Sequence, residues 1–262
     1  MASSSNRPLE GRVALVTGAS GDIGGATAVR LAELGARVGV NDHSSESGAR
    51  RVQRTIEAVG GTGMLLRADV GSEAAVLDLA RKIDSELGTV TLLVNNAGGG
   101  ADHNQIEHLS LREWERVVTT NLTSAFLCTR AFVPGMKKAG TGRIVNISSI
   151  CGLSGDCDPA YCASKAGILG LTRSTAARLA PTIQVNAVLP GFVGTKYHEA
   201  RRALVKTVAP DGRLSDPSEI AELVVTLLTL KSTFLTGACI PMDGGASFAS
   251  LGMHMNWVQD AD

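Results

Sequence analysis

Residues 13–24 read Val13-Ala14-Leu15-Val16-Thr17-Gly18-Ala19-Ser20-Gly21-Asp22-Ile23-Gly24. The apolar run at the start is typical of a buried strand, and the glycines after it let the backbone turn sharply into a helix. In such a turn a pyrophosphate can approach the amino terminus of the helix, where free N–H groups favour negative charge. An ordinary strand-to-helix turn is the alternative, but the place between the first strand and the first helix favours a phosphate site. The candidate contacts are Gly18, Asp22, Ile23 and Gly24.

From this stretch onward, short β-branched runs alternate with longer amphipathic stretches, which is the pattern of parallel strands joined by crossover helices. The expected strands span residues 13–17, 37–41, 63–68, 91–95, 143–148, 184–189 and 238–242. The expected helices span residues 23–34, 46–59, 72–86, 111–136, 160–179 and 217–230. Because crossovers are right-handed, the pattern predicts an α/β fold, with a doubly wound parallel sheet of about seven strands in one Rossmann-like domain.

The remaining segments are placed around this pattern. Residues 1–10 are expected to form a flexible leader, and residues 11–262 a single dinucleotide-binding catalytic domain. Residues 196–216 interrupt the alternation after the carboxyl end of a strand, a position suited to a lid over a ligand. Residues 246–262 form a C-terminal tail that is apolar enough to pack on another surface, for example the cleft of a neighbouring subunit.

Composition narrows the class of partner. The 262 residues include 25 Lys plus Arg and 25 Asp plus Glu, a balance that favours neither a nucleic acid nor an anionic membrane surface. No apolar stretch approaches the roughly 18 to 20 residues of a membrane span. We therefore expect a small-molecule partner.

The five cysteines are odd in number and include no C-x-x-C pair, which is typical of reduced thiols in a cytoplasmic protein. Cys151, Cys157 and Cys162 lie close together in the sequence, and a metal or redox role is one interpretation. The segment contains no His and its spacing does not match a zinc clip. Small buried side chains are the favoured interpretation, and no metal is expected.

Asp42 ends the second expected strand, in Val38-Gly39-Val40-Asn41-Asp42-His43. A carboxylate at this position can accept hydrogen bonds from both ribose hydroxyls and repels a 2′-phosphate. The alternative is a cap on the next helix, but Ser44 and Ser45 stand closer to that helix. The turn from Gly18 to Gly24 also lacks Arg and Lys. NAD(H) is therefore favoured over NADP(H) as cofactor.

Tyr161 and Lys165 are four residues apart in an expected helix, so their side chains project from one face. This spacing often arises by chance and needs support from its neighbourhood. Upstream, the expected strand at residues 143–148 brings the hydroxyls of Ser148 and Ser149 to the carboxyl edge of the sheet. A phenol has a pKa of about 10, and an ammonium group and an oxidised nicotinamide close by lower that pKa toward neutrality. Tyr161 can then serve as a general base.

Taken in order, these motifs resemble the short-chain dehydrogenase/reductase family in its short, single-domain form, from Leu9 to Gly245. Residues 17–24 resemble its glycine motif, Asp69-Val70 its adenine contact, and Asn95-Asn96-Ala97-Gly98 its fourth-strand motif. Asn121, Ser149, Tyr161 and Lys165 resemble its catalytic tetrad. Pro190, Gly191, Val193 and Thr195 lie in a segment that resembles the nicotinamide loop, and Asp243-Gly244-Gly245 resembles the close of the last strand.

The resemblance implies a role for each of these residues. Tyr161 acts as general acid/base while a hydride moves between the carbinol carbon and nicotinamide C4. Ser149 hydrogen-bonds the substrate oxygen, and Lys165 holds the nicotinamide ribose. Asn121 anchors a water relay, although a buried polar residue satisfied by backbone is an equal alternative from sequence alone. Cofactor contacts are implied for Tyr161, Lys165, Asp69, Val70, Asn96, Ala97, Gly98 and the nicotinamide loop. A homo-oligomer, specifically a tetramer, is also implied, with the helices at residues 111–136 and 160–179 as candidate contacts.

The chain departs from the family pattern at two places. Asp22 stands where the family has its second glycine, and a carboxylate there repels a pyrophosphate unless it turns toward solvent. The spacing from Ser149 to Tyr161 is one residue shorter than the more frequent spacing, and Ser148 would recover that count. Gly152 favours Ser149, because the family's glycine usually follows its catalytic serine by three. We expect the shortening to fall in Ser154–Pro159, a loop on the substrate side, and to bear on specificity.

The predicted reaction is the interconversion of a secondary alcohol and a ketone with NAD(H), in the cytoplasm. Reduction of a 3-oxoacyl thioester or a polyketide-type ketone, which usually uses NADPH, is the alternative within the class. A non-catalytic dinucleotide-binding regulatory protein is the alternative from another class, and Asp22 is its only support. The expected walls of the substrate cleft have mixed side chains that point to no single chemical group: Gly99–His103, Ser154–Pro159 and Val193–Val208.

Overall fold

The computed structural model describes residues 7–101, 105–155, 157–195, 205–206 and 209–249. Seven parallel strands form one sheet in the order β3-β2-β1-β4-β5-β6-β7, which confirms the expected doubly wound α/β fold. The strands are β1 (Val13–Val16), β2 (Arg37–Asp42), β3 (Thr62–Arg67), β4 (Val90–Asn95), β5 (Gly142–Ile147), β6 (Ile183–Pro190) and β7 (Cys239–Met242). Their bounds lie close to the expected ones.

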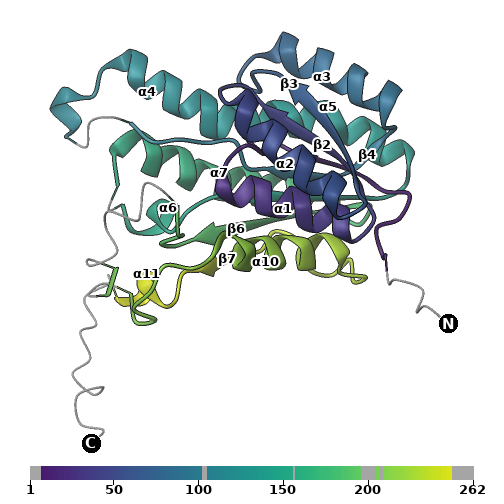
Figure 1. Cartoon of the computed structure of the whole chain (residues 1–262). Helices are drawn as coiled ribbons and strands as arrows, with labels where there is room; N and C mark the ends of the chain where they lie inside the picture. The colour runs from purple at the N-terminus through teal and green to yellow at the C-terminus, as the bar shows by residue number, and fades with distance from the viewer. Residues whose placement is uncertain (1–6, 102–104, 156, 196–204, 207–208, 250–262) are drawn as a thin grey trace, which may run out of the picture.

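Helices cover both faces of the sheet (Figure 1). One face carries α1 (Asp22–Glu33), α2 (Glu46–Ala58) and α10 (Pro217–Thr229); the other carries α3 (Glu73–Glu86), α5 (Ser124–Lys138) and α7 (Pro159–Leu179). In β1, Ala14 and Val16 belong to the first core and Val13 and Leu15 to the second, because successive side chains of a strand point to opposite faces. Burial on both faces explains why the strands are apolar at consecutive positions. None of the helices in the described part of the chain is long and apolar enough to cross a membrane.

The single helix expected at residues 111–136 is divided in the structure. A π-helical turn, η2 (Thr119–Thr123), joins α4 (Leu111–Val118) to α5 and carries Asn121. Asn121 Nδ2 donates to the Val117 carbonyl at 2.8 Å, and the Ser124 hydroxyl donates to the Thr120 carbonyl at 2.6 Å. Side chains thus take part in the backbone hydrogen bonding of this turn. Periodicity alone predicted one uninterrupted helix, and it also missed three short elements: η1 (Ile106–His108), α6 (Cys151–Ser154) and α11 (Ala246–Ala249).

The expectation that residues 1–10 form a flexible leader is wrong for residues 7–10. Leu9 is 2% exposed and packs in the core under α1, α2 and α10. Its N–H donates to the Leu34 carbonyl at 2.9 Å. Residues 7–10 therefore belong to the domain, because Leu9 buries an apolar side chain at the end of α1; residues 1–6 lie outside the described part of the chain.

Cys151 and Cys157 form a disulfide, with their Cα atoms 5.9 Å apart. That separation is one a disulfide normally spans. The expectation that all five cysteines are reduced is wrong for this pair, because the turn of α6 brings together two cysteines that are six residues apart. Cys128 is buried, which raises the pKa of its thiol to about 12. The cytoplasmic location inferred from the cysteines stays a prediction.

The strand order reverses between β1 and β4, which are neighbours in the sheet although β2 and β3 come between them in the sequence. The helix after β1 lies on one face, and the helical segment after β4 leads to the other face. In open parallel sheets, ligands bind in the crevice that such a divergence opens at the carboxyl ends of the strands. The site is therefore sought where β1 and β4 end.

Candidate functional site

The turn after β1 contains glycines for which the fold leaves no room for a side chain. Gly18 has a φ of +61°, and a Cβ there would lie 2.9 Å from Ala97 Cα. A Cβ on Gly24 would lie 2.5 Å from Asn96 Nδ2 and 2.6 Å from the Gly18 carbonyl oxygen. Glycine is required at both positions, and with no side chain there the backbone at the start of α1 can be approached closely by a phosphate group.

Thr17 and Asn96 fasten this turn to the loop that follows β4. The Thr17 hydroxyl accepts hydrogen bonds from the N–H groups of Asn96 and Ala97, at 2.9 and 3.0 Å. Asn96 Nδ2 donates to the carbonyls of Thr17 and Gly18, at 2.9 and 3.1 Å. The amide of Asn96, which the sequence assigned to the cofactor, supports the turn, and Thr17 is a supporting residue that sequence analysis missed.

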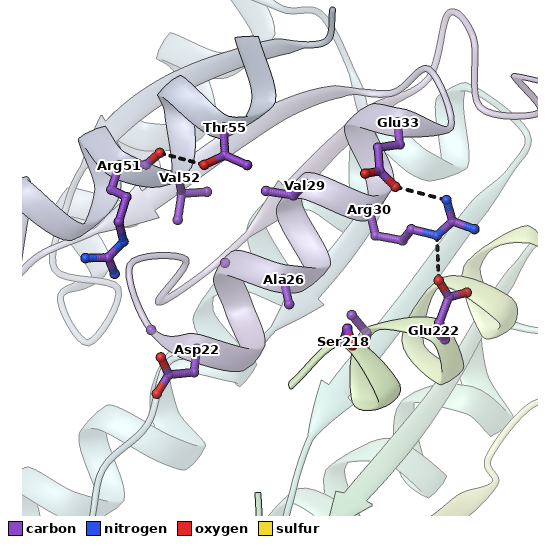
Figure 2. A pocket seen from close by; sticks show the side chains of 13 residues that line it. Asp22, Ala26, Val29, Arg30, Glu33, Arg51, Val52, Thr55, Ser218 and Glu222 are labelled. Carbon is purple, nitrogen blue, oxygen red and sulfur yellow. Dashed lines mark hydrogen bonds and ion pairs between the residues drawn. The ribbon is translucent and has the colours of Figure 1, made fainter. Parts of the chain in front are cut away.

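Asp22, the departure from the family's glycine motif, is exposed at the first residue of α1. It lines one end of a groove of about 460 Å³ between α1, α2 and α10, and Arg30, paired with Glu33 and Glu222, lines the other end (Figure 2). This groove lies on the opposite face of the sheet from α7, which carries Tyr161. Sequence analysis expected a carboxylate at this position to repel a pyrophosphate unless its side chain turns toward solvent. The side chain of Asp22 is exposed to solvent, so this condition is met.

Asp42 lies at the end of β2 and is 6% exposed. The Ser20 hydroxyl donates to Asp42 Oδ1, and the Ser45 N–H donates to Asp42 Oδ2 at 2.5 Å. Ser45 itself caps α2 by accepting a hydrogen bond from the Gly48 N–H, so the cap does not depend on Asp42. An ionised carboxylate has about four acceptor positions, so two of them remain for ribose hydroxyls. The contact with Ser20 was not predicted, because nothing in the local sequence pairs a residue of the turn with the next strand.

Asp69 and Val70 follow β3 at the same edge of the sheet. Val70 is buried, and Asp69 Oδ1 accepts a hydrogen bond from the Gly71 N–H at 2.9 Å. The carboxylate of Asp69 thus shapes the turn in which Val70 is placed.

Lys165 projects from α7 and is buried, with 3% of its surface exposed. Its Nζ donates to the Ile147 carbonyl at 2.9 Å and lies 5.4 Å from the centre of the Tyr161 ring. Burial lowers the pKa of Lys165 to about 8, so the ammonium form still predominates at pH 7. A cation is therefore held beside the phenol ring, as the four-residue spacing predicted.

The two serines after β5 differ in what their hydroxyls do. Ser148 donates to the Lys165 carbonyl at 2.8 Å, which ties β5 to α7. Ser149 Oγ accepts a hydrogen bond from the Cys151 N–H at 3.1 Å, which leaves its own proton for another acceptor. A Cβ on Gly152 would lie 2.8 Å from the Lys165 carbonyl carbon, so a glycine is needed where α6 crosses α7. These contacts favour Ser149 over Ser148 as the serine that meets a substrate.

Asn121 sits in the π-helical turn η2 and is buried. Its Nδ2 donates to the Gly99 carbonyl at 2.7 Å, and its Oδ1 accepts a hydrogen bond from the Gly99 N–H at 3.2 Å. A Cβ on Gly98 would lie 2.5 Å from Asn121 Oδ1 and 3.2 Å from Lys165 Nζ. The loop after β4 therefore fits between Asn121 and Lys165. The side-chain amide of Asn121 is hydrogen-bonded to backbone groups, as the structural alternative for this residue expected.

The expected nicotinamide loop follows β6 and is described as far as Thr195. Val193 is buried and pairs with Ser215, and Pro190 ends the strand. A Cβ on Gly191 would lie 2.7 Å from Asp243 Cβ, so this glycine allows the last strand's end to pack on the loop. Most of the expected lid, residues 196–204 and 207–208, lies outside the described part of the chain. The same holds for residues 102–103 and 156 of the expected cleft walls and for residues 250–262 of the tail.

The structure thus brings most of the expected site residues to the carboxyl edge of β1, β4 and β5. The glycine turn after β1 packs against Ala97, and the next residue, Gly98, lies against Asn121 and Lys165. Lys165 in turn lies beside the ring of Tyr161. Among the described residues, no three side chains of His, Cys, Asp or Glu gather as they do around a metal ion.

Comparison with known proteins gives consistent results. The profile of the short chain dehydrogenase family matches residues 12–205. The 3-oxoacyl-[acyl-carrier-protein] reductase FabG of Vibrio cholerae is 40% identical over 243 residues, which cover 90% of this chain and 98% of that protein. Cis-4-hydroxycyclohexanecarboxylate dehydrogenase of Sinomonas cyclohexanicum is 39% identical over 240 residues, covering 89% and 96%. The crystal structure of a short-chain type dehydrogenase/reductase from Mycobacterium marinum superimposes with a TM-score of 0.85 at 33% identity, covering 94% and 99%.

Proposed function

The chain belongs to the short-chain dehydrogenase/reductase family, and on this premise we propose which residues carry its reaction and which dinucleotide it prefers. It is an oxidoreductase that acts on CH–OH groups and ketones with a nicotinamide dinucleotide. When bound, the nicotinamide supplies the acceptor or donor of the hydride. The substrate proposed here is a secondary alcohol or its ketone.

Tyr161 is the general acid/base of this proposal. The observation that carries it is the buried ammonium of Lys165, 5.4 Å from the centre of the Tyr161 ring. A cation in a water-poor environment favours the phenolate, so Tyr161 can take the hydroxyl proton in oxidation and return it in reduction. Ser149 donates its proton to the substrate oxygen and stabilises the negative charge that develops there.

Lys165 and Asn121 complete the proposed tetrad. Lys165 keeps further protons for the nicotinamide ribose, since the Ile147 carbonyl accepts only one of its three. Asn121 holds the loop after β4 through Gly99, and the water relay implied by the resemblance is proposed to use the one acceptor position that remains on its Oδ1. Both residues thus connect the catalytic phenol to the cofactor side of the crevice.

The residues present fit a nicotinamide dinucleotide. A pyrophosphate would lie on the glycine turn from Gly18 to Gly24, whose glycines leave the backbone bare. Asp42 would hold the adenosine ribose, Asp69 and Val70 would border the adenine, and Ala97, Gly98 and the loop from Pro190 to Thr195 would border the nicotinamide half. We propose that NAD(H) is preferred over NADP(H), because a buried, oriented carboxylate at the end of β2 repels a 2′-phosphate.

The catalytic proposal is tested by hydride transfer, followed by nicotinamide absorbance over a panel of secondary alcohols and ketones. We expect turnover by the wild-type protein and a fall of about 100- to 10,000-fold in kcat for Tyr161→Phe. The circular dichroism spectrum and the thermal unfolding midpoint should be close to those of the wild type in this variant, which shows that its fold is intact. Absence of turnover with either dinucleotide, or wild-type turnover by Tyr161→Phe, would sink the proposal.

The cofactor preference is tested separately by kcat/KM for NADH and NADPH in the wild-type protein and in Asp42→Ala. We expect the wild type to favour NADH and the variant to lose about tenfold or more of that preference, because the repulsive charge is gone. Asp42→Asn is the matched control, since it keeps the shape and removes the charge. A wild-type preference for NADPH would overturn the proposed cofactor preference and leave the catalytic proposal standing.

A second substrate class is 3-oxoacyl thioesters. It is favoured by the similarity to relatives such as the FabG protein of Vibrio cholerae, which is named a 3-oxoacyl-[acyl-carrier-protein] reductase. Including a 3-oxoacyl thioester in the panel decides between the two classes by kcat/KM. The highest value for the thioester, together with NADPH preference, would favour this class over the main one. The regulatory alternative has lost its only support, because Asp22 is exposed.

A homo-oligomer is proposed as the working form, and a tetramer as its size. On α4 and α5, in the segment that the resemblance marks as a contact, the large apolar side chains of Leu111 and Phe126 are 71% and 44% exposed. Burying them against a second copy would remove apolar surface from water. Light scattering on the purified protein gives the mass, and a monomer at all concentrations would contradict the proposal.

A further inference from the structure

The loop after β4 contains the run Gly98-Gly99-Gly100-Ala101. Three successive glycines carry no side chains with which to pack, and glycine loses more conformational freedom on ordering than any other residue. A loop of this composition cannot hold its own shape. Its position between Asn121 and Lys165 must therefore be fixed by groups that other elements supply.

Three side chains from three elements bind three successive residues of this loop. Asn121, in η2, binds both the N–H and the carbonyl of Gly99, as described above. Arg116, on α4, donates from Nη2 to the Gly100 carbonyl at 3.0 Å. Asp158, at the start of α7, accepts a hydrogen bond from the Ala101 N–H on Oδ2 at 3.2 Å. Each of these contacts joins the loop to a helical segment.

Asp158 differs from the other two because its second oxygen holds the catalytic helix. Asp158 is the N-cap of α7, and its Oδ1 accepts a hydrogen bond from the Tyr161 N–H at 2.7 Å. The residue is only 6% exposed, so both contacts are made by one nearly buried carboxylate. A Cβ on Gly100 would lie 3.1 Å from Asp158 Oδ2, so a glycine at that position lets the loop approach the carboxylate.

We propose that Asp158 is a positioning residue of the reaction: its carboxylate joins the first turn of the catalytic helix to the glycine loop and so fixes Tyr161 relative to the loop beside Lys165 and Asn121. The inference rests on the proposed role of Tyr161. A cap alone requires only one acceptor, which Ser, Thr or Asn supplies as well as Asp. The joining function requires two acceptors on one side chain, which among residues of this length only Asp provides.

The substitutions Asp158→Asn and Asp158→Ser separate these two functions. Each keeps an oxygen for the Tyr161 N–H, so the cap is retained and the protein should fold with nearly wild-type thermal stability. Asn presents an NH2 group to the Ala101 N–H, and Ser has no second acceptor within reach. We expect kcat to fall about 10- to 100-fold in both variants, because small displacements of catalytic groups have effects of this size. Dinucleotide affinity should stay within about twofold, since Asp42 and the glycine turn are untouched.

Amide hydrogen exchange supplies a readout that does not depend on substrate. In both variants the peptide containing residues 98–101 should exchange faster than in the wild type, while the peptide containing the first turn of α7 should not change. Ser110→Ala is the matched control: Ser110 is exposed and caps α4 by accepting a hydrogen bond from the Glu113 N–H, and its loss removes a cap without touching the loop. This variant should lose stability and keep kcat and the exchange of the loop.

Two results would overturn the inference. Wild-type kcat together with wild-type loop exchange in Asp158→Asn and Asp158→Ser would show that Asp158 is a cap and nothing more. Faster exchange confined to α7, with any change of kcat, would show that the carboxylate acts on the helix alone. If instead Tyr161→Phe retained full turnover, the proposed function would fail, while the exchange experiment would still decide whether Asp158 holds the loop.

Discussion

Two glycine-rich turns follow neighbouring strands, one after β1 and one after β4, and the structure holds them in different ways. In the first turn, a Cβ on Gly18 or Gly24 would collide with atoms of Asn96, Ala97 or the turn itself. In the second, within the described part of the chain, nothing lies within 4 Å of where a Cβ on Gly99 would be, and the backbone is fastened by side chains of Asn121, Arg116 and Asp158. The first turn needs glycine for space at both Gly18 and Gly24, whereas the second needs it for space at Gly98 and is fixed beyond that residue by contacts from elsewhere.

The difference fits the two tasks that we propose for these turns. A pyrophosphate is the same in every dinucleotide, so a turn that can take only one shape suits it. The second turn borders the catalytic residues, and contacts from α4, η2 and α7 allow its position to depend on the helix that carries Tyr161. Substitutions should therefore act by steric collision at Gly18 and Gly24 in the first turn, and in the second turn, beyond Gly98, by loss of hydrogen bonds.

The largest effect is expected from Gly24→Ala. Its Cβ would lie 2.5 Å from Asn96 Nδ2 and 2.6 Å from the Gly18 carbonyl oxygen, so the turn must shift or unfold. We expect the Kd for the dinucleotide, measured by calorimetry, to rise at least about 100-fold, and the free energy of unfolding to fall by about 1–3 kcal/mol. Gly21→Ala is the control, because its Cβ would meet only the Gly18 carbonyl oxygen at 3.5 Å. Equal losses in both variants would show that the turn is not limited by space.

A pH-dependent effect is expected from Lys165, which borders the second turn. Burial lowers the pKa of Lys165 from 10.5 to about 8, so between these values the unfolded chain binds more protons than the folded one. The free energy of unfolding contributed by this group therefore rises as the pH increases from about 8 to about 10.5, and it is lost as the pH falls back through 8. The total change is on the order of 3 kcal/mol.

The measurement compares Tyr161→Phe with the double variant Tyr161→Phe/Lys165→Met by denaturant unfolding across this pH range. The Tyr161→Phe background removes the titration of the phenol. Cys128, whose buried thiol has its pKa raised to about 12, titrates in both proteins and cancels in the difference. The protein with Lys165 should gain stability relative to the Met variant as the pH rises. Parallel curves would mean that Lys165 is not desolvated as the structure indicates.

How much of this could be predicted from the sequence depends on the range of the contacts involved. Apolar runs in most of the strands and the glycine motif from Thr17 to Gly24 are local features, and they predicted the doubly wound parallel sheet correctly. The Tyr161 and Lys165 pair was predicted because helical spacing is also local. The sequence favoured Ser149 over Ser148 without a physical reason. The structure supplies one, because the hydroxyl of Ser148 is already donated to the Lys165 carbonyl.

The features that were missed depend on residues far apart in the chain. Ser20 meets Asp42, and Asp158 meets Ala101, through contacts that span 22 and 57 residues. The π-helical turn at Asn121 is stabilised by Gly99, which lies 22 residues earlier. The hydrophobic periodicity of residues 111–136 therefore could not predict this turn. Side-chain contacts of this kind become visible only when the sheet has placed the loops against one another.

The smallest effect, and the one that separates the two turns most directly, is expected from Gly99→Ala. The structure gives Gly99 a backbone conformation without a positive φ and, among the described residues, no neighbour within 4 Å of an added Cβ. Alanine restricts the unfolded chain more than glycine does, so the free energy of unfolding should rise by about 0.4–1 kcal/mol, measured by urea unfolding. Gly98→Ala, whose Cβ would lie 2.5 Å from Asn121 Oδ1, should instead lower it. If Gly99→Ala were as destabilising as Gly98→Ala, the second turn would be limited by space at Gly99 as well as at Gly98, and the distinction between the two turns would be wrong.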